Sequence, residues 1–308
     1  AFLLSPLASY ISGSTLTVHG GGEKPAFLSA GNTDNGSSSS AAGGTGSEQA
    51  TSEAKGQLKG AGATSQESAI GAWADGVTSV APELTVQYSP DGSGAGREKF
   101  LAGAVSFAGS DSAMKDEEAD KAKEVCGDQG AFHVPAYVSP IAIAYNLPSV
   151  KEDIKMDAET VAKVFAGEIK KWNDDAIASQ NEGVELPDTD ITVVHRSDKS
   201  GTTKNFVSYL SEAAPEAWTY EVAEEWPSDI TAESAQGTKG VVGQASSTEG
   251  AITYTDASAV GTLGTVDVKV GDEYVKQSPE AAAKLVETSE EKEDGSLEID
   301  RATTEQGV

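Results

Sequence analysis

From Leu58 onward, segments with the character of β-strands alternate with segments of helical periodicity. LTVQYS at 84–89 and GAITYT at 250–255 are short runs rich in β-branched and aromatic residues, whereas AETVAKVFAGEIKKW at 158–172 repeats its apolar residues at helical spacing. Strands that alternate with helices are typical of α/β proteins with largely parallel sheets. Ligands of such sheets bind beyond the carboxyl ends of strands, where helices begin, so the strand-to-helix turns are the expected place of a site.

The remaining segments follow the same alternation. Two strands are expected around Pro140, in VPAYVSPIAIAYN at 134–146. A glycine turn and a helix with Ile70 and Trp73 on one face are expected within 60–76. The other expected elements are a strand in 104–111, a helix that starts in 94–103, a strand in 190–198 and a helix over 202–213.

Composition limits the class of protein and of partner. A chain of 308 residues can form one large domain or two ordinary ones, and 38% hydrophobic residues indicate a globular protein. No run of about 18 uncharged apolar residues appears, so no membrane span is expected. The formal charge of −27 argues against nucleic acid, which is bound through clustered Lys and Arg. If the ligand is an anion, a local constellation has to attract it against the field of the whole protein.

Cysteine and histidine give little support for metal or disulfide chemistry. The single cysteine, Cys126, permits no internal disulfide, and we expect a buried or idle thiol, with an intermolecular partner as the alternative. His19, His133 and His195 are scattered outside metal-type HxH or HExxH frames, so structural roles are expected for them. No cofactor is expected.

The first 55 residues differ from the rest. Residues 1–28 resemble the C-terminal end of short-chain dehydrogenases, but the chain has neither a GxxxGxG turn nor a Tyr-xxx-Lys pair, so that resemblance carries no chemistry. A fusion, a misassigned start and coincidence remain open as its origin. Residues 29–55 are rich in Gly, Ser and Thr and are expected to form a flexible tether.

Three strand-to-helix turns share one chemistry. GAGATS at 60–65, GSGAG at 92–96 and SGTT at 200–203 each combine glycines with hydroxyl side chains at an expected helix start. Helix N-termini offer unpaired N–H groups that suit an anion, although plain N-capping by Ser or Thr also explains any single turn. Arg196 ends an apolar strand and could grip two oxygens of an oxyanion, or could pair with Asp198 on the surface.

These motifs resemble the phosphate-binding protein of bacterial high-affinity phosphate ABC importers. The resemblance runs from about residue 58 to about 260 and is carried by the stretches GAGAT at 60–64, AWADG at 72–76, GSGAGREKFLAGAVSFAGSD at 92–111, PAYVSPIAIAYNLP at 135–148 and VVHRSDKSGTT at 193–203. It implies a two-lobed class II solute-binding fold with a hinge, with a first lobe over 56–145 and a second over 146–308. The phosphate ligands that it implies are Thr64, Ser65, Ser93, Asp111, Arg196, Ser200, Gly201 and Thr202, with Asp198 orienting the arginine.

The sequence departs from the family pattern in a few places. Position 65 is commonly aromatic in the family and is serine here, which its backbone N–H can tolerate. Beyond a region like 262–308, the family chain returns to the first lobe, and we expect that return to lie past Val308. We expect the native protein to lie on the cell surface or in the periplasm, tethered to the membrane as a lipoprotein, although LSAGN at 28–32 holds no cysteine for a lipid.

The leading functional prediction is a monomeric, extracytoplasmic protein that binds inorganic phosphate and delivers it to an ABC permease without catalysis. A phosphatase or phosphotransferase that uses Asp111 or a serine near Arg196 is the enzymatic alternative. It is disfavoured because neither a metal-ligand cluster nor a histidine beside a candidate nucleophile is evident. A surface protein that keeps the fold but binds no phosphate is the third possibility.

Overall fold

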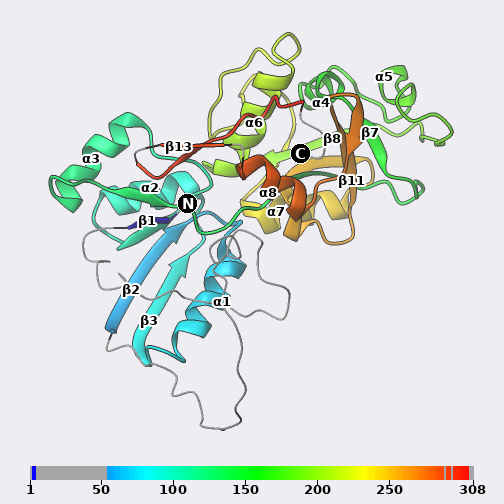
Figure 1. Cartoon of the computed structure of the whole chain (residues 1–308). Coiled ribbons are helices and arrows are strands. Elements are labelled where there is room, and N and C mark those ends of the chain that lie inside the picture. The colour runs from blue at the N-terminus through cyan, green and yellow to red at the C-terminus, as the bar shows by residue number, and fades with distance from the viewer. Residues whose placement is uncertain (1, 5–53, 288, 293, 305–308) are drawn as a thin grey trace, which may run out of the picture.

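The chain folds into two lobes, each built on its own β-sheet (Figure 1). The computed structural model describes residues 2–4, 54–287, 289–292 and 294–304. The expected 1–28 segment and 29–55 tether lie outside the described residues, except for Phe2–Leu4, Ala54 and Lys55. We define the first lobe as residues 54–134 together with 2–4, and the second lobe as residues 141–287.

The first lobe contains a five-stranded sheet in the order β3-β2-β4-β1-β5. Its strands β2, β3 and β4 run parallel, whereas β1 pairs antiparallel with both β4 and β5. The elements of this lobe are β1 (Phe2–Leu4), β2 (Lys55–Gly62), α1 (Glu67–Val77), β3 (Glu83–Ser89), α2 (Ser93–Leu101), β4 (Phe107–Gly109), α3 (Asp116–Cys126) and β5 (Phe132–Val134).

The second lobe contains a seven-stranded sheet in the order β12-β11-β6-β10-β8-β9, with β7 paired to β11. Strand β8 runs parallel to β9 and β10, and β6 runs antiparallel to β10 and β11. The elements of this lobe are β6 (Ile141–Tyr145), β7 (Ile154–Met156), α4 (Ala158–Phe165), α5 (Asp175–Ala178), β8 (Thr192–Arg196), α6 (Gly201–Ala213), β9 (Glu233–Ala235), α7 (Gly237–Ser247), β10 (Ala251–Asp256), η3 (Ala257–Ala259), β11 (Gly264–Val270), β12 (Glu273–Val275) and α8 (Pro279–Glu287).

The larger hydrophobic core lies in the second lobe, where aromatic side chains pack below the carboxyl ends of the strands. Tyr254 stacks on Phe206 at a centroid distance of 4.6 Å and on Trp226 at 5.6 Å, and Trp172 is fully buried. The smaller core of the first lobe includes Phe100 and Cys126. Burial of large aromatic side chains is a dominant source of packing energy, so this aromatic cluster stabilises the positions of β8 and α6.

The chain passes between the lobes more than once (Figure 1). Residues 135–140 connect β5 to β6. After α8, the hairpin of β13 (Glu290–Glu291) and β14 (Leu297–Glu298) forms its own two-stranded sheet and contacts the first lobe, where the carbonyl oxygen of Asp294 accepts a 2.8 Å hydrogen bond from the His133 N–H. Arg301 then forms an ion pair with Glu212 on α6. The described residues contain no helix that combines the length and apolar character needed to cross a bilayer.

The predicted α/β class and the two-lobed architecture are confirmed, and most expected strands and helices form. Two expectations were wrong. The helix expected over 158–172 ends at Phe165, because Gly167 adopts φ +76 and breaks the helical path. The first of the two strands expected around Pro140 ends at Val134, and residues 135–140 lie outside any strand. Prolines at 135 and 140 lack the N–H that a sheet ladder requires.

Candidate functional site

The three glycine and hydroxyl turns meet where the two lobes touch. The first opens α1 after β2, the second opens α2 after β3, and the third opens α6 after β8. Backbone hydrogen bonds join them: the Gly92 N–H donates to the Gly62 carbonyl at 2.8 Å, and the Gly94 N–H donates across the lobes to the Lys199 carbonyl at 3.3 Å. The structure therefore places the N-termini of α1, α2 and α6 around one region, which we call the cradle.

Asp111 lies at the centre of the first-lobe side of the cradle. The Ser65 hydroxyl lies 2.8 Å from its Oδ1 and 2.7 Å from its Oδ2, and the Thr202 hydroxyl of the second lobe donates to Oδ2 at 3.1 Å. Its backbone N–H donates to the Ser93 hydroxyl at 3.2 Å. An ionised carboxylate only accepts hydrogen bonds, so these contacts present Asp111 as an acceptor surrounded by donors.

Arg196 is buried at the end of β8, with only 3% of its surface exposed. Its guanidinium donates through Nε and Nη2 to the two carboxylate oxygens of Asp198, a bidentate pair. Its backbone N–H donates to the Tyr254 hydroxyl, which lies in the aromatic cluster below. Burial raises the pKa of Tyr254 to about 12, so this hydroxyl stays neutral.

Asp198 connects the arginine to the turn before α7. Burial works to raise the pKa of Asp198, but hydrogen bonds from Arg196 and from the Gly237 N–H outweigh burial and lower it. The adjoining Thr238 N–H donates to the Thr64 hydroxyl of the first lobe at 3.0 Å. A continuous set of contacts therefore runs from Arg196 through Asp198 and α7 to Thr64. Arg196 and Asp198 do pair, as the alternative to an anion role expected, but Arg196 is buried and only 11% of the Asp198 side chain is exposed, so the pair is not on the surface.

Ser200, Gly201 and Thr202 form the first turn of α6. The Ser200 hydroxyl accepts from the Thr203 N–H at 3.1 Å, so it caps the helix as the N-capping alternative proposed. A Cβ added to Gly201 would lie 2.7 Å from the Ser93 Oγ and 2.9 Å from the Asp111 Cβ. Only glycine lets the two lobes approach this closely.

A buried ionic network crosses the lobes beside the cradle. The guanidinium of Arg97, on α2, donates to Glu118 at 3.1 Å and to Glu224 of the second lobe at 2.8 Å. The Ser112 hydroxyl also donates to Glu224, and the Glu224 carbonyl oxygen accepts from the Ser200 N–H at 3.0 Å. Burial works to raise the pKa of Glu224, but the bond from Arg97 outweighs it and holds the pKa below its ordinary value.

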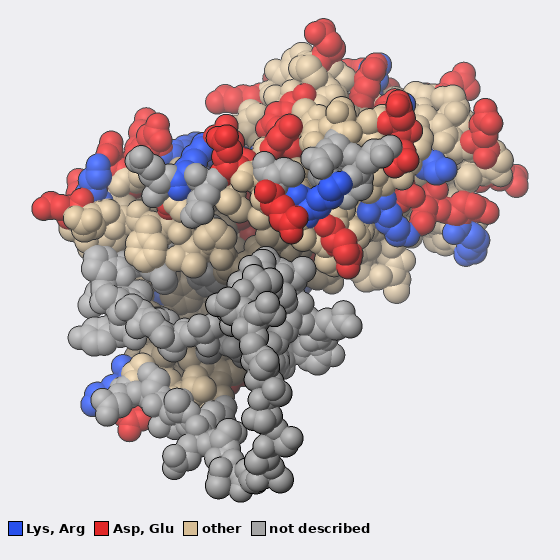
Figure 2. Space-filling view, in the orientation of Figure 1, with Lys and Arg blue, Asp and Glu red and all other residues tan. Residues whose placement is uncertain are grey.

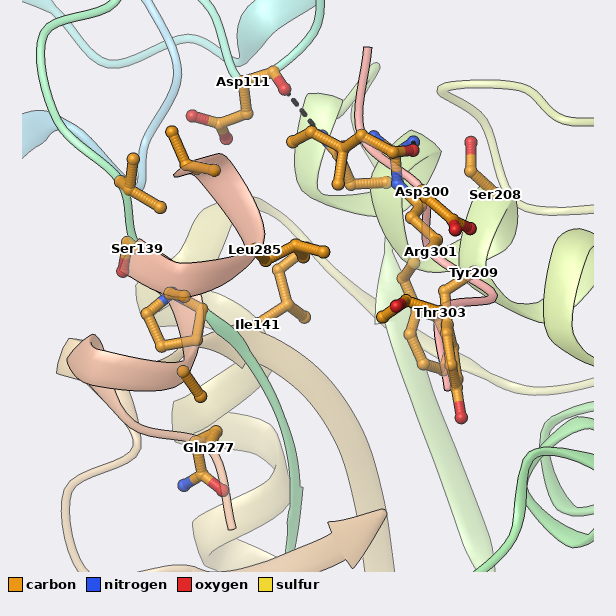
Figure 3. A pocket seen from close by; sticks show the side chains of 18 of the residues that line it. Asp111, Ser139, Ile141, Ser208, Tyr209, Gln277, Leu285, Asp300, Arg301 and Thr303 are labelled. Atoms are coloured by element: carbon orange, nitrogen blue, oxygen red, sulfur yellow. Dashed lines mark hydrogen bonds between the residues drawn. The ribbon is translucent and has the colours of Figure 1, made fainter. Parts of the chain in front are cut away.

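The protein carries a large negative charge, and a cavity lies beside part of the cradle. Figure 2 shows Asp and Glu spread over the visible face with fewer Lys and Arg between them, in keeping with the net charge of −27. Ser65, Asp111 and Thr202 are among the residues that line a cavity of about 1240 Å³. Figure 3 shows Asp111 in this cavity together with Tyr209 of α6 and Leu285 of α8. Lys204 and Arg301 are among the cationic side chains that line this cavity, whereas Arg97 and Arg196 do not line it.

The cradle also contains residues that the sequence analysis did not single out, namely Gln66, Arg97, Asn205, Glu224 and Thr238. Only Thr238 had a readable signal, since GTKG at 237–240 repeats the glycine and hydroxyl pattern at a helix start. Glu224 lies 127 residues from Arg97, and no pattern in the sequence around either residue predicts that they pair.

His195 contacts the backbone of Arg196, whereas His133 and Cys126 lie apart from the cradle contacts; His19 lies outside the described residues. His195 stacks on Trp226 at 5.2 Å and donates through Nδ1 to the Arg196 carbonyl oxygen. His133 is buried, and Cys126 is buried without a disulfide partner in the described chain. No group of three or more His, Cys, Asp or Glu in the described stretches could hold a metal ion.

Comparison with known proteins identifies the family. A family model described as a PBP superfamily domain matches residues 47–306. The phosphate-binding protein PstS2 of Mycobacterium bovis is 37% identical over 256 residues, which cover 81% of this chain and 68% of the relative. PstS 3 of Mycobacterium leprae is 38% identical over 228 residues, which cover 74% of this chain and 61% of the relative. The chain thus spans about two thirds of the length of these curated relatives.

Solved structures show the same fold. A phosphate-binding protein from Stenotrophomonas maltophilia superposes with a TM-score of 0.58 at 19% identity, covering 80% of this chain and 73% of that one. A phosphate ABC transporter substrate-binding protein from Clostridium perfringens gives a TM-score of 0.57 at 19% identity, covering 74% and 81%. From the family model, the relatives and the fold together, the chain belongs to the PBP superfamily and, within it, to the PstS phosphate-binding proteins.

Proposed function

We propose that this protein binds inorganic phosphate between its two lobes and delivers it to a membrane ABC permease, without catalysing a reaction. The relatives are named phosphate-binding proteins, and the Clostridium perfringens structure is described as a substrate-binding protein with bound phosphate. The family consists of binding proteins, which sets aside the phosphatase alternative. We further propose a monomer that works outside the cytoplasm, tethered through its N-terminal region.

The observation that carries this proposal is the meeting of the N-termini of α1, α2 and α6 beside the Asp111 carboxylate, with the buried guanidinium of Arg196 at the end of the strand that leads into α6. Arg196 supplies the positive charge, and the turns that contain Thr64, Ser93 and Ser200 supply hydroxyl and N–H donors. Asp111 accepts hydrogen bonds only. A tetrahedral oxyanion that still carries a proton satisfies both kinds of partner, and phosphate near neutral pH is such an anion.

The roles of the proposed ligands follow from their positions. Arg196 binds two anion oxygens, and Asp198 holds the guanidinium in place. Asp111 accepts a hydrogen bond from the protonated oxygen of the anion. The remaining donors, through hydroxyl or backbone N–H groups at helix N-termini, are Thr64, Ser65, Ser93, Ser200, Gly201 and Thr202.

Titration calorimetry with phosphate, arsenate and sulfate tests the function. Phosphate and arsenate, which are protonated alike, are expected to bind, whereas sulfate offers no proton to Asp111 and is expected to be rejected. Incubation with a phosphomonoester is expected to release no phosphate. Absence of heat with phosphate at millimolar concentration would refute the proposal, and equal affinity for sulfate would refute the role of Asp111.

Asp111→Asn is expected to narrow the difference between phosphate and sulfate affinity. The amide keeps the shape of the carboxylate but offers an N–H donor, so it removes the repulsion of sulfate lone pairs. We expect sulfate affinity to rise at least about tenfold while phosphate affinity falls, measured by the same calorimetry. A variant that binds phosphate and still rejects sulfate as firmly as the parent would contradict this prediction.

Gly201→Ala is expected to hinder closure of the two lobes on phosphate. The added methyl would lie within 3 Å of Ser93 and Asp111, so the lobes must stay further apart. We expect phosphate affinity to fall about tenfold, with little change in thermal stability. Small-angle scattering should show less compaction with phosphate than in the parent. Gly243→Ala is the matched control, because nothing lies within 4 Å of a Cβ at that helical glycine.

A further inference from the structure

Gln66 is a buried amide at the start of α1 whose side chain does not serve the helix. It is the N-cap residue, yet its side chain makes no capping hydrogen bond, and only 2% of its surface is exposed. Ser, Thr, Asn and Asp are the residues that cap helices well. A long polar side chain buried at this position therefore requires a different explanation.

The amide of Gln66 points at the central carboxylate of the cradle. Its Nε2 donates to the Asp111 Oδ1 at 3.2 Å. The Ser65 hydroxyl lies almost equally far from both carboxylate oxygens and carries one proton, so it cannot distinguish them. Within the first lobe, Gln66 is thus the side chain that selects Oδ1, and it leaves Oδ2 toward Thr202 of the second lobe.

The carbonyl end of the Gln66 amide lies in a position that is costly for a polar atom. The Oε1 of Gln66 is buried and finds no donor among the described residues, which is costly for a carbonyl group. It packs beside Gly109, where an added Cβ would lie 2.5 Å from Oε1 and 2.4 Å from the Tyr88 hydroxyl. The local structure leaves an acceptor unpaired and requires a glycine, while the donor end of the amide reaches Asp111.

We propose that Gln66 is a positioning residue for anion selectivity: it holds the Asp111 carboxylate so that Oδ2 faces the proton of the bound anion. This inference rests on the proposed phosphate-binding function. Gln66, Ser65 and Asp111 all belong to the first lobe, so the acceptor is set before the second lobe closes with Thr202.

Holding the Asp111 carboxylate in place is expected to raise phosphate affinity and to lower sulfate affinity. The terminal torsion of an aspartate side chain is broad and roughly two-fold, so a carboxylate without its Oδ1 partner can turn. A turned carboxylate accepts the phosphate proton less well, which lowers phosphate affinity. The same freedom lets it turn away from sulfate, which weakens the rejection of the wrong ligand.

Gln66→Met tests the proposal, because methionine is similar in length and shape and has no donor. We expect phosphate affinity to fall about tenfold and the ratio of phosphate to sulfate affinity to fall more than that, measured by titration calorimetry. Gln66→Asn, whose shorter amide stays polar but cannot reach Asp111, is expected to change the ratio in the same direction. The thermal midpoint of each variant is measured beside the affinities.

A double-mutant cycle separates positioning from a merely structural role. In an Asp111→Asn background, Gln66→Met is expected to leave the anion ratio unchanged, because it acts through the carboxylate. Gln180→Met is the matched control: its Nε2 donates to Thr160, far along the second lobe, and the variant is expected to shift stability but not the ratio.

The outcomes are distinguishable. An unchanged ratio in Gln66→Met, or an equal loss with and without Asp111, overturns the positioning role even though the parent binds phosphate. If the parent protein itself binds no phosphate, the proposed function fails and this inference fails with it.

Discussion

Arg196→Ala is expected to lower phosphate affinity by about a hundredfold or more. The guanidinium of Arg196 is 3% exposed, and the other proposed ligands around the anion are neutral donors or the acidic Asp111. Hydrogen bonds to charged groups contribute roughly 1.5–3 kcal/mol each, and the guanidinium can form two of them with one anion. Titration calorimetry with phosphate measures the loss.

Part of that loss comes from the partner that the arginine leaves behind. Asp198, whose side chain is only 11% exposed, would remain without its cation, and its charge would repel phosphate. Arg196→Ala combined with Asp198→Asn is therefore expected to bind phosphate better than Arg196→Ala alone. The phosphate affinity of Arg196→Lys should lie between those of the parent and of the alanine variant, because an ammonium group keeps the charge but cannot bind two oxygens in the planar, bidentate manner of a guanidinium. If the phosphate affinity of Arg196→Ala is within threefold of that of the parent, Arg196 does not belong to the phosphate site.

The sequence predicted the parts of the site that depend on local chemistry. The glycine and hydroxyl residues at helix starts are visible in the stretches GAGATS, GSGAG and SGTT. The apolar strand that ends in Arg196 is likewise visible in the sequence. Parallel strands β2 and β3 bring the first two turns to one end of their sheet, and contacts between the lobes join them to the turn that follows β8. Their assignment as phosphate ligands remains a proposal.

The parts that could not be predicted depend on contacts between distant residues. Gln66 appears from sequence as an ordinary residue before a helix, and its role emerges only when β4 brings Asp111 within 3.2 Å. Arg97 had been read only as part of a helix start, since nothing near 97 or 224 marks the two as partners. Helix ends were missed for a related reason: the apolar repeat of 158–172 continues past the glycine that ends α4.

The Arg97 network leads to the second large prediction, which concerns stability. Arg97 is 2% exposed and donates to Glu118, Ser110, Ser112 and Glu224, so its removal takes the bonded cation from Glu224, whose side chain is 9% exposed, and from the half-buried Glu118. We expect Arg97→Met to lower the free energy of unfolding by about 3–5 kcal/mol. Urea denaturation of parent and variant measures the difference. Lys199→Met is the control, since it breaks an exposed pair with Glu98 across the same lobes and should cost about 1 kcal/mol or less.

Two further measurements show whether the loss arises at Glu224. Arg97→Met with Glu224→Leu removes both charges, and it should recover part of the lost stability because apolar pairs replace buried ion pairs at little cost. The pKa of Glu224 is lowered in the folded protein, so its contribution is present above its ordinary pKa of 4.5 and is lost as pH falls through the lowered value. The difference in unfolding free energy between the parent and Arg97→Met should therefore become smaller at acidic pH. A gap that stays constant from neutral pH into that range would show that Glu224 is not the partner on which the stability depends.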